Sequence, residues 1–142
     1  MTYTYEYPRP CVTVDMAVFR KQDDVLEVLL IQRKYPPHQD MWAFPGGFIN
    51  MDEALEEAAH RELKEETGLT GISLKQLYTF GDVHRDPRAR VITVVYFGMA
   101  EYDHSMVKAD DDAKEARWFA ADQVPEMAFD HHKVLEIAMN RL

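Results

Sequence analysis

The 142-residue sequence has one cysteine, no long apolar run and few basic side chains. With Cys11 alone, neither an intramolecular disulfide nor a cysteine-based metal site can form. No apolar run approaches the roughly 20 residues that a helix needs to cross a bilayer. Residues 1–10 lack the basic and apolar regions of a signal peptide. These absences predict a cytoplasmic protein that has no membrane partner.

Basic side chains are outnumbered, because 16 Lys and Arg residues against 25 Asp and Glu residues give a net charge of −9. Phosphate surfaces repel such a chain, so we predict no nucleic-acid partner and no binding to anionic membranes. A small substrate that carries phosphate is still compatible with this charge if a metal cation mediates the contact. The length and the ordinary apolar share of 46% suit one domain over residues 1–142.

Stretches rich in apolar residues predict the secondary structure. We expect strands at residues 11–19, 25–34, 72–83 and 91–100, shorter strands within 42–47 and 116–120, and helices at 53–67 and 131–142. Asp52 and Asp130 are expected to be the N-caps of the two helices, and Gly68 to end the first. This order of elements predicts an α+β fold in which helices pack on the faces of a mixed sheet.

The first predicted helix places carboxylates on its apolar side. At 100° per residue, Glu62 and Glu66 lie within roughly 20° of Leu55, and Glu65 shares their face. A solvated acidic face is the ordinary explanation of a glutamate-rich helix, but it does not explain carboxylates that point toward the core. Buried carboxylates lose hydration and repel one another, and Arg61 can restrain only one of them. A hard divalent cation, Mg²⁺ or Mn²⁺, would offset both effects.

A glycine turn, Pro45-Gly46-Gly47, precedes this helix. Glycine lets the backbone approach a ligand closely and turn its carbonyl or N–H groups toward it. A metal-binding helix beside a bare backbone turn suits a pyrophosphate, because the cations can bridge phosphate oxygens and activate water.

Residues 47–69 resemble the motif of the Nudix hydrolase family. That motif is Gly, five residues, Glu, seven residues, Arg-Glu, an aliphatic residue, any residue, Glu-Glu, any residue, Gly and an aliphatic residue. It falls here, without departure, on Gly47, Glu53, Arg61, Glu62, Leu63, Glu65, Glu66, Gly68 and Leu69. The order of the predicted elements is also similar to the family's α/β/α sandwich with a mixed central sheet.

The resemblance implies metal-dependent hydrolysis of a nucleoside diphosphate linked to another moiety. The ligands of Mg²⁺ or Mn²⁺ would be Glu62, Glu65, Glu66 and the carbonyl of Gly47. Arg61 would hold a catalytic glutamate in place by ion pairing, and Glu53 would support the loop or a metal-bound water.

The resemblance leaves the general base open, because its position varies across the family. Asp111, Asp112 and Glu115 are candidates in this sequence. A solvated acidic loop before a strand explains these residues equally well.

The loop at residues 84–90 supplies the candidate substrate-binding side chains His84, Arg85 and Arg88. Guanidinium groups suit phosphate oxygens, although an ordinary polar hairpin would have the same composition. Arg33 could also face the phosphates, or could keep an edge strand soluble. The loop and its flanks resemble the Nudix subgroup that handles ADP-ribose, which implies cleavage to AMP and ribose 5-phosphate.

Two other functions are consistent with the motif. One is house-cleaning hydrolysis of oxidised or non-standard nucleoside triphosphates. The other is a non-catalytic ADP-ribose sensor. Such regulators resemble the same subgroup but carry an added C-terminal DNA-binding domain, for which the residues after the last predicted helix leave no room. A small nucleotide is the expected partner, and the aromatic residues 3–8 could exchange between copies in a homodimer.

Overall fold

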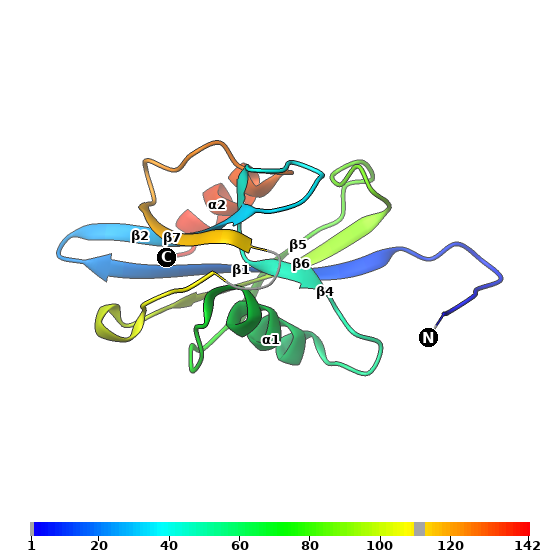
Figure 1. Cartoon of the computed structure of the whole chain (residues 1–142), viewed down its shortest axis with the longest axis horizontal. Coiled ribbons are helices and arrows are strands. Elements are labelled where there is room, and N and C mark those ends of the chain that lie inside the picture. The colour runs from blue at the N-terminus through cyan, green and yellow to red at the C-terminus, as the bar shows by residue number, and fades with distance from the viewer. Residues whose placement is uncertain (1, 110–112) are drawn as a thin grey trace.

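The computed structural model describes residues 2–109 and 113–142. Its strands are β1 (Cys11–Gln22), β2 (Val25–Arg33), β3 (Trp42–Ala43), β4 (Gly46–Phe48), β5 (Lys75–Phe80), β6 (Val91–Met99) and β7 (Ala113–Ala120). Its helices are α1 (Leu55–Thr67), α2 (His131–Met139) and the short 3-10 helix η1 (Tyr102–His104). Helices α1 and α2 lie on opposite sides of the sheet (Figure 1), which confirms the predicted α+β sandwich.

Strand β1 is the centre of the mixed sheet. It runs antiparallel to β2 and β4 and parallel to β6. Strand β5 pairs with β6, while β3 and β7 both pair with β2. The short β4 places Gly46 opposite Asp15 and Gly47 opposite Val14. The turn that precedes α1 is therefore attached directly to the central strand.

Both faces of β1 are buried, because successive side chains of a strand point to opposite sides of the sheet. On one face, Val14, Met16 and Val18 belong to the cluster that contains the apolar side of α1. On the other face, Ala17 and Phe19 belong to the cluster that contains the apolar side of α2. The two helices therefore pack against the sheet through separate cores.

Helix α1 begins later than predicted. It starts at Leu55 with Ala54 in the N-cap position, so the prediction of Asp52 as the cap is wrong. The N–H of Ala54 instead donates to the carboxylate of Glu57 at 3.0 Å. An acid inside the first turn thus satisfies the end of the helix, and no capping side chain is needed.

The C-terminal ends of the helices follow the prediction only in part. Gly68 ends α1 as expected, since its φ of 80° is left-handed and its N–H donates to the carbonyl of Lys64 at 2.9 Å. Helix α2 ends at Met139 and is shorter than predicted. In the described part of the chain, no helix is long and apolar enough to cross a membrane.

Gly98 in β6 leaves no room for a side chain. A Cβ there would lie 2.4 Å from the carbonyl oxygen of Ser73, so Gly98→Ala has to displace backbone. We expect this variant to lose about 1–3 kcal/mol of unfolding free energy, measured by urea denaturation. Gly81→Ala is the matched control, because a Cβ there meets no atom within 4 Å. Equal midpoints for the two variants would contradict the expectation.

Candidate functional site

A cavity of about 390 Å³ opens where β1, the turn between β3 and β4, α1 and the start of α2 meet. The acidic side chains in its lining are Asp15, Glu62, Glu66 and Asp86. The arginines in its lining are Arg33, Arg61, Arg85 and Arg88. Because both charges occur together, the ion pairs among these residues determine what charge is left for a ligand.

Glu66 on α1 is buried beside this cavity, with 6% of its surface exposed. The N–H of Gly46 donates to its Oε1 at 3.0 Å, which joins the turn to the helix. Burial raises the pKa of Glu66 well above its ordinary range. The hydrogen bond from Gly46 opposes this shift, and the negative charges of Glu62 and Asp15 add to it. The helix therefore points this carboxylate inward, as its periodicity predicted.

Glu62 touches bare backbone at Gly47. A Cβ on Gly47 would lie 2.6 Å from the carboxylate of Glu62, so any other residue at this position would displace that side chain. Burial raises the pKa of Glu62, whereas the hydrogen bond and the charge of Arg61 lower it. Two crowded carboxylates, Glu62 and Glu66, beside an exposed stretch of backbone form an oxygen-rich site that fits a hard divalent cation.

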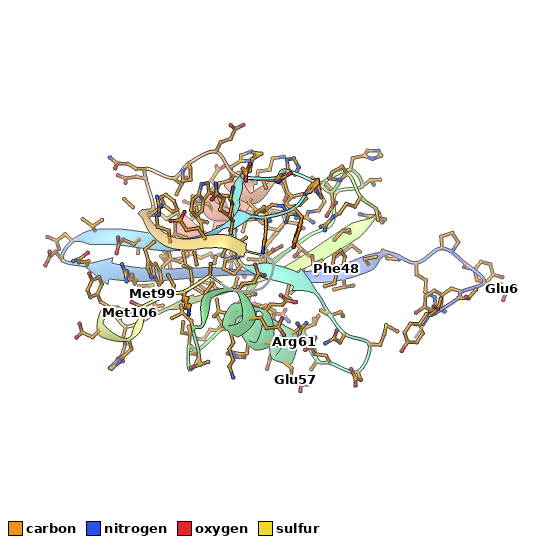
Figure 2. All side chains as sticks on the ribbon, in the orientation of Figure 1. Glu6, Phe48, Glu57, Arg61, Met99 and Met106 are labelled. Atoms are coloured by element: carbon orange, nitrogen blue, oxygen red, sulfur yellow. The ribbon has the colours of Figure 1, made fainter. Side chains whose placement is uncertain are left out.

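Arg61 ties the glutamates of α1 to the preceding loop. Its Nε donates to Glu53 at 2.5 Å, and its Nη1 donates to Glu62 at 2.9 Å and to Glu65 at 3.1 Å. Its Nη2 donates to the carbonyl of Phe48 at 3.2 Å, and both residues are labelled in Figure 2. The hydrogen bond to Glu53 raises the pKa of Arg61, so its charge is permanent. These contacts support the predicted roles of Arg61 and Glu53 in holding the glutamates and the loop.

Glu65 stands apart from the other two predicted metal ligands of α1. Its carboxylate accepts the hydrogen bond from Arg61, and 44% of its side chain is exposed. Within residues 2–109 and 113–142, no group of three carboxylate, histidine or cysteine side chains is placed to hold a metal ion. The structure thus brings together Glu62, Glu66 and Gly47, and the metal set that includes Glu65 stays a prediction.

Two of the predicted substrate-binding arginines are paired with carboxylates. Arg85 donates to both oxygens of Asp130 at 2.9 and 2.8 Å, and only 4% of its side chain is exposed. Arg88 makes a similar fork with Asp86 at 3.0 and 2.7 Å. Asp130 occupies the N-cap position of α2, as predicted, although its side chain makes no capping hydrogen bond. Arg85 and Asp130 instead anchor the loop to α2.

Arg33 lines the cavity, whereas His84 does not. The Nε of Arg33 donates to the carbonyl of Pro37 at 2.8 Å. Burial and, after it, the charge of Arg88 lower the pKa of Arg33. His84 is exposed and lies outside the cavity lining, so the structure does not bring it to the site as predicted.

Three acidic residues were predicted as candidates for the general base. Asp111 and Asp112 lie outside the described residues. Glu115 lies on β7, where it is partly exposed, accepts hydrogen bonds from Arg117 and does not line the cavity.

A buried polar chain that the sequence analysis missed supports the wall beside Glu66. The hydroxyl of Thr93 donates to Asp15 at 2.5 Å, and the other oxygen of Asp15 lies 3.8 Å from Nε2 of His131. Nδ1 of His131 accepts the N–H of Phe44 at 3.0 Å. Burial lowers the pKa of His131, so the ring is neutral and carries its proton on Nε2. The charge of Asp15 within an otherwise apolar strand was the signal that could have revealed this chain.

The geometry and the motif agree on one family. A family model described as NUDIX domain matches residues 9–137. The chain belongs to the NUDIX family. Its NUDIX motif, residues 47–69, covers β4 from Gly47 onward, the loop before α1, α1 itself and the two residues after it, and the family match confirms the resemblance found in the sequence.

Proteins similar to this chain include a transcriptional repressor, a pyrophosphatase and a NUDIX domain solved with ADP ribose. The ADPR responsive transcriptional repressor NtrR of Acinetobacter baylyi is 38% identical over 96% of this chain, and the chain spans 56% of the repressor's length. An ADP-ribose pyrophosphatase of Methanocaldococcus jannaschii is 40% identical over 92% of this chain and 73% of its own length. The NUDIX domain of Shewanella oneidensis NrtR, solved with ADP ribose, is 35% identical with a TM-score of 0.87, over 95% of this chain and 90% of that one.

The raised pKa of Glu66 predicts how the metal-free NUDIX domain responds to pH. Between the ordinary value of 4.5 and the raised value, the folded chain keeps a proton that the unfolded chain has released. Stability therefore falls as pH increases through that window. Glu66→Gln removes the ionisation and keeps an oxygen that can accept the N–H of Gly46. We expect this variant to be more stable than the unaltered chain near neutral pH and to respond less to pH.

Urea denaturation with a chelator present, from about pH 5 to pH 8, measures this effect. Glu56→Gln is the matched control, because Glu56 is exposed on the same helix. If Glu66→Gln were destabilised while keeping the original dependence on pH, the burial of a charged carboxylate would be the wrong explanation.

Proposed function

We propose that this chain is a divalent-cation-dependent Nudix pyrophosphohydrolase that cleaves ADP-ribose to AMP and ribose 5-phosphate. The observation that carries the proposal is the pair of Glu66, which is buried, and Glu62, which is partly buried, beside the glycine turn in a cavity that is also lined by arginines. Without a cation this crowding is unfavourable, and with one it forms a site for a diphosphate. Single-domain organisation over residues 1–142 and a cytoplasmic location stay predictions.

Mg²⁺ or Mn²⁺ would be held by Glu62, Glu66 and the backbone of Gly47, with Glu65 joining them if it leaves Arg61. When bound, such a cation neutralises phosphate charge and makes water a stronger nucleophile. Arg61 keeps the glutamates oriented through its hydrogen bonds to Glu53 and Glu62. Because these groups come from β4, α1 and the loop that joins them, the protein side of the site is largely preformed.

The reaction consumes only water and the nucleotide, because the cation is not changed by it. Water adds to one phosphorus, the bridging P–O bond breaks, and the leaving phosphate keeps the bridging oxygen. The water gives up a proton, which a carboxylate of the site accepts. Arg33 lines the cavity and would bind oxygens of the diphosphate through its guanidinium group.

Similarity to known proteins favours ADP-ribose as the substrate. One relative is named as an ADP-ribose pyrophosphatase, and the Shewanella oneidensis NUDIX domain was solved with ADP ribose. The two proteins share the ligand although only one is named as a hydrolase, so ADP-ribose recognition has more support than its cleavage. The triphosphate alternative has no comparable support among these relatives.

A second candidate function is ADP-ribose sensing, which the similarity to the repressor NtrR favours. A sensor binds the nucleotide without consuming it and passes the signal to DNA. The complete set of motif residues in this chain favours the enzyme, because a sensor does not need every metal ligand. The absence of a nucleic-acid partner therefore stays a prediction, as does a homodimer.

A substrate panel separates these functions. We expect the chain, incubated with Mg²⁺, to convert ADP-ribose to AMP and ribose 5-phosphate, identified by chromatography and mass spectrometry. Nucleoside triphosphates should react far more slowly. Tight binding of ADP-ribose without products at saturating Mg²⁺ would instead support the sensor, and rapid turnover of triphosphates alone would support house-cleaning.

Replacing one carboxylate tests the catalytic centre. Glu62→Gln removes a charge, keeps the shape and leaves an acceptor for Arg61, so we expect turnover to fall at least about a hundredfold while the fold is retained. Steady-state rates with ADP-ribose and a thermal melt measure both effects. Glu56→Gln on the exposed side of α1 should change neither. Normal hydrolysis by Glu62→Gln would remove that residue from the mechanism.

A further inference from the structure

Phe129 is held in an unusual conformation at the cavity wall. Its φ of 54° is in the left-handed region, which a bulky side chain rarely adopts unless the surroundings enforce it. His38 meets its ring edge-on at a centroid distance of 4.8 Å, and the ring of His131 lies at 5.6 Å. Strained backbone of this kind concentrates at functional sites. Two neighbouring rings therefore help to define the position and the tilt of the Phe129 ring.

Arg33 is the cavity arginine that this ring contacts at shortest range. Its Cζ lies 5.0 Å from the centroid of Phe129, and its Nε donates to the carbonyl of Pro37. The Cζ of Arg88 lies 5.5 Å from the same centroid, but Arg88 is already paired with Asp86. The ring of Phe129 therefore contacts two guanidinium groups. That of Arg88 is ion-paired with Asp86, and that of Arg33 is hydrogen-bonded to a backbone carbonyl.

Each of the other arginines that line the cavity forms an ion pair with a carboxylate. Their carboxylate partners are Glu53 for Arg61, Asp130 for Arg85 and Asp86 for Arg88. Within residues 2–109 and 113–142, no carboxylate forms an ion pair with Arg33. Its fixed neighbours, a ring face and a carbonyl, are both uncharged, so its positive charge is kept.

An aromatic face and a carboxylate have different effects on a cation. A carboxylate cancels the charge and competes with an incoming phosphate, whereas a ring stabilises the guanidinium through its quadrupole and leaves the terminal N–H donors for a ligand. Burial, followed by the charge of Arg88, lowers the pKa of Arg33, and the charges of nearby carboxylates oppose this shift. Within the described residues, none of those carboxylates forms an ion pair with the guanidinium.

We propose that Phe129 is a positioning residue whose ring holds the guanidinium of Arg33 toward the cavity, uncancelled, so that it binds the diphosphate of ADP-ribose. This inference rests on the proposed function and extends it to a residue outside the Nudix motif. Arg33 touches the substrate, and Phe129 acts through Arg33.

Variants of Phe129 give the first test. We expect Phe129→Leu, which keeps apolar bulk but has no ring, to raise the KM for ADP-ribose about tenfold with kcat within about twofold of the unaltered chain. Phe129→Tyr keeps the ring and should restore KM to within about twofold. Phe97→Leu is the matched control, because Phe97 is a partly buried phenylalanine of the α2-side core that does not line the cavity. It should leave KM unchanged.

A double-mutant cycle tests whether the effect passes through Arg33. Arg33→Gln alone should raise KM about tenfold, and adding Phe129→Leu should raise it by no more than about twofold further. If the two effects multiplied, Phe129 would act independently of Arg33 and the inference would be overturned.

Pentafluorophenylalanine at position 129 keeps the shape of the ring and reverses its quadrupole. We expect this replacement to raise KM as Phe129→Leu does, which decides the question if the leucine variant fails to fold. An unchanged KM in this replacement would overturn the inference while leaving the proposed function intact. Absence of ADP-ribose turnover by the unaltered chain would overturn the proposed function and, with it, this inference.

Discussion

The carboxylate of Glu66 accepts the N–H of Gly46 while almost wholly buried, and the site is arranged around that contact. Burial and neighbouring charge disfavour the ionised form, so the metal-free chain carries an unfavourable arrangement at its centre. The glycine turn makes the arrangement possible, because a side chain at Gly47 would displace Glu62. A cation that enters this site relieves a repulsion that folding has already imposed.

The arginines around the cavity serve different purposes although they share one chemistry. Arg85 is buried against Asp130 and connects the loop at residues 84–90 to α2, which is a structural role. Arg61 orients the glutamates of the motif. Arg33 is packed on Phe129 and keeps its charge. The number of arginines alone therefore does not identify which of them bind the substrate. The partner of each guanidinium group in the structure indicates its role.

Much of the site could be predicted because it is local in sequence. The inward direction of Glu62 and Glu66 follows from helical periodicity, and the contact with Gly47 follows from a motif within a single turn and helix. The pair of Arg85 and Asp130 could not be predicted, since 45 residues separate the partners and the contact depends on where the loop meets α2.

Other features were missed because residue type alone does not determine which contacts a side chain makes. Asp52 is a good capping residue by type, but the acid at Glu57 satisfies the N-terminus of α1 in its place. The proposed role of Phe129 depends on a left-handed backbone angle and on the ring of His38, which comes from a distant segment. Neither the backbone angle nor this ring contact can be predicted from residue type and spacing.

The parallel pairing of β1 with β6 joins segments that lie roughly 80 residues apart in the chain. Closing so long a loop is slow and yields contacts only when both segments are in place. Asp15 depends on both, because its neighbour in the sheet is Val95 and its hydroxyl donor is Thr93. The polar contacts of Asp15 beneath the glycine turn therefore depend on a long-range pairing, and a chain in which β1 and β6 separate loses them.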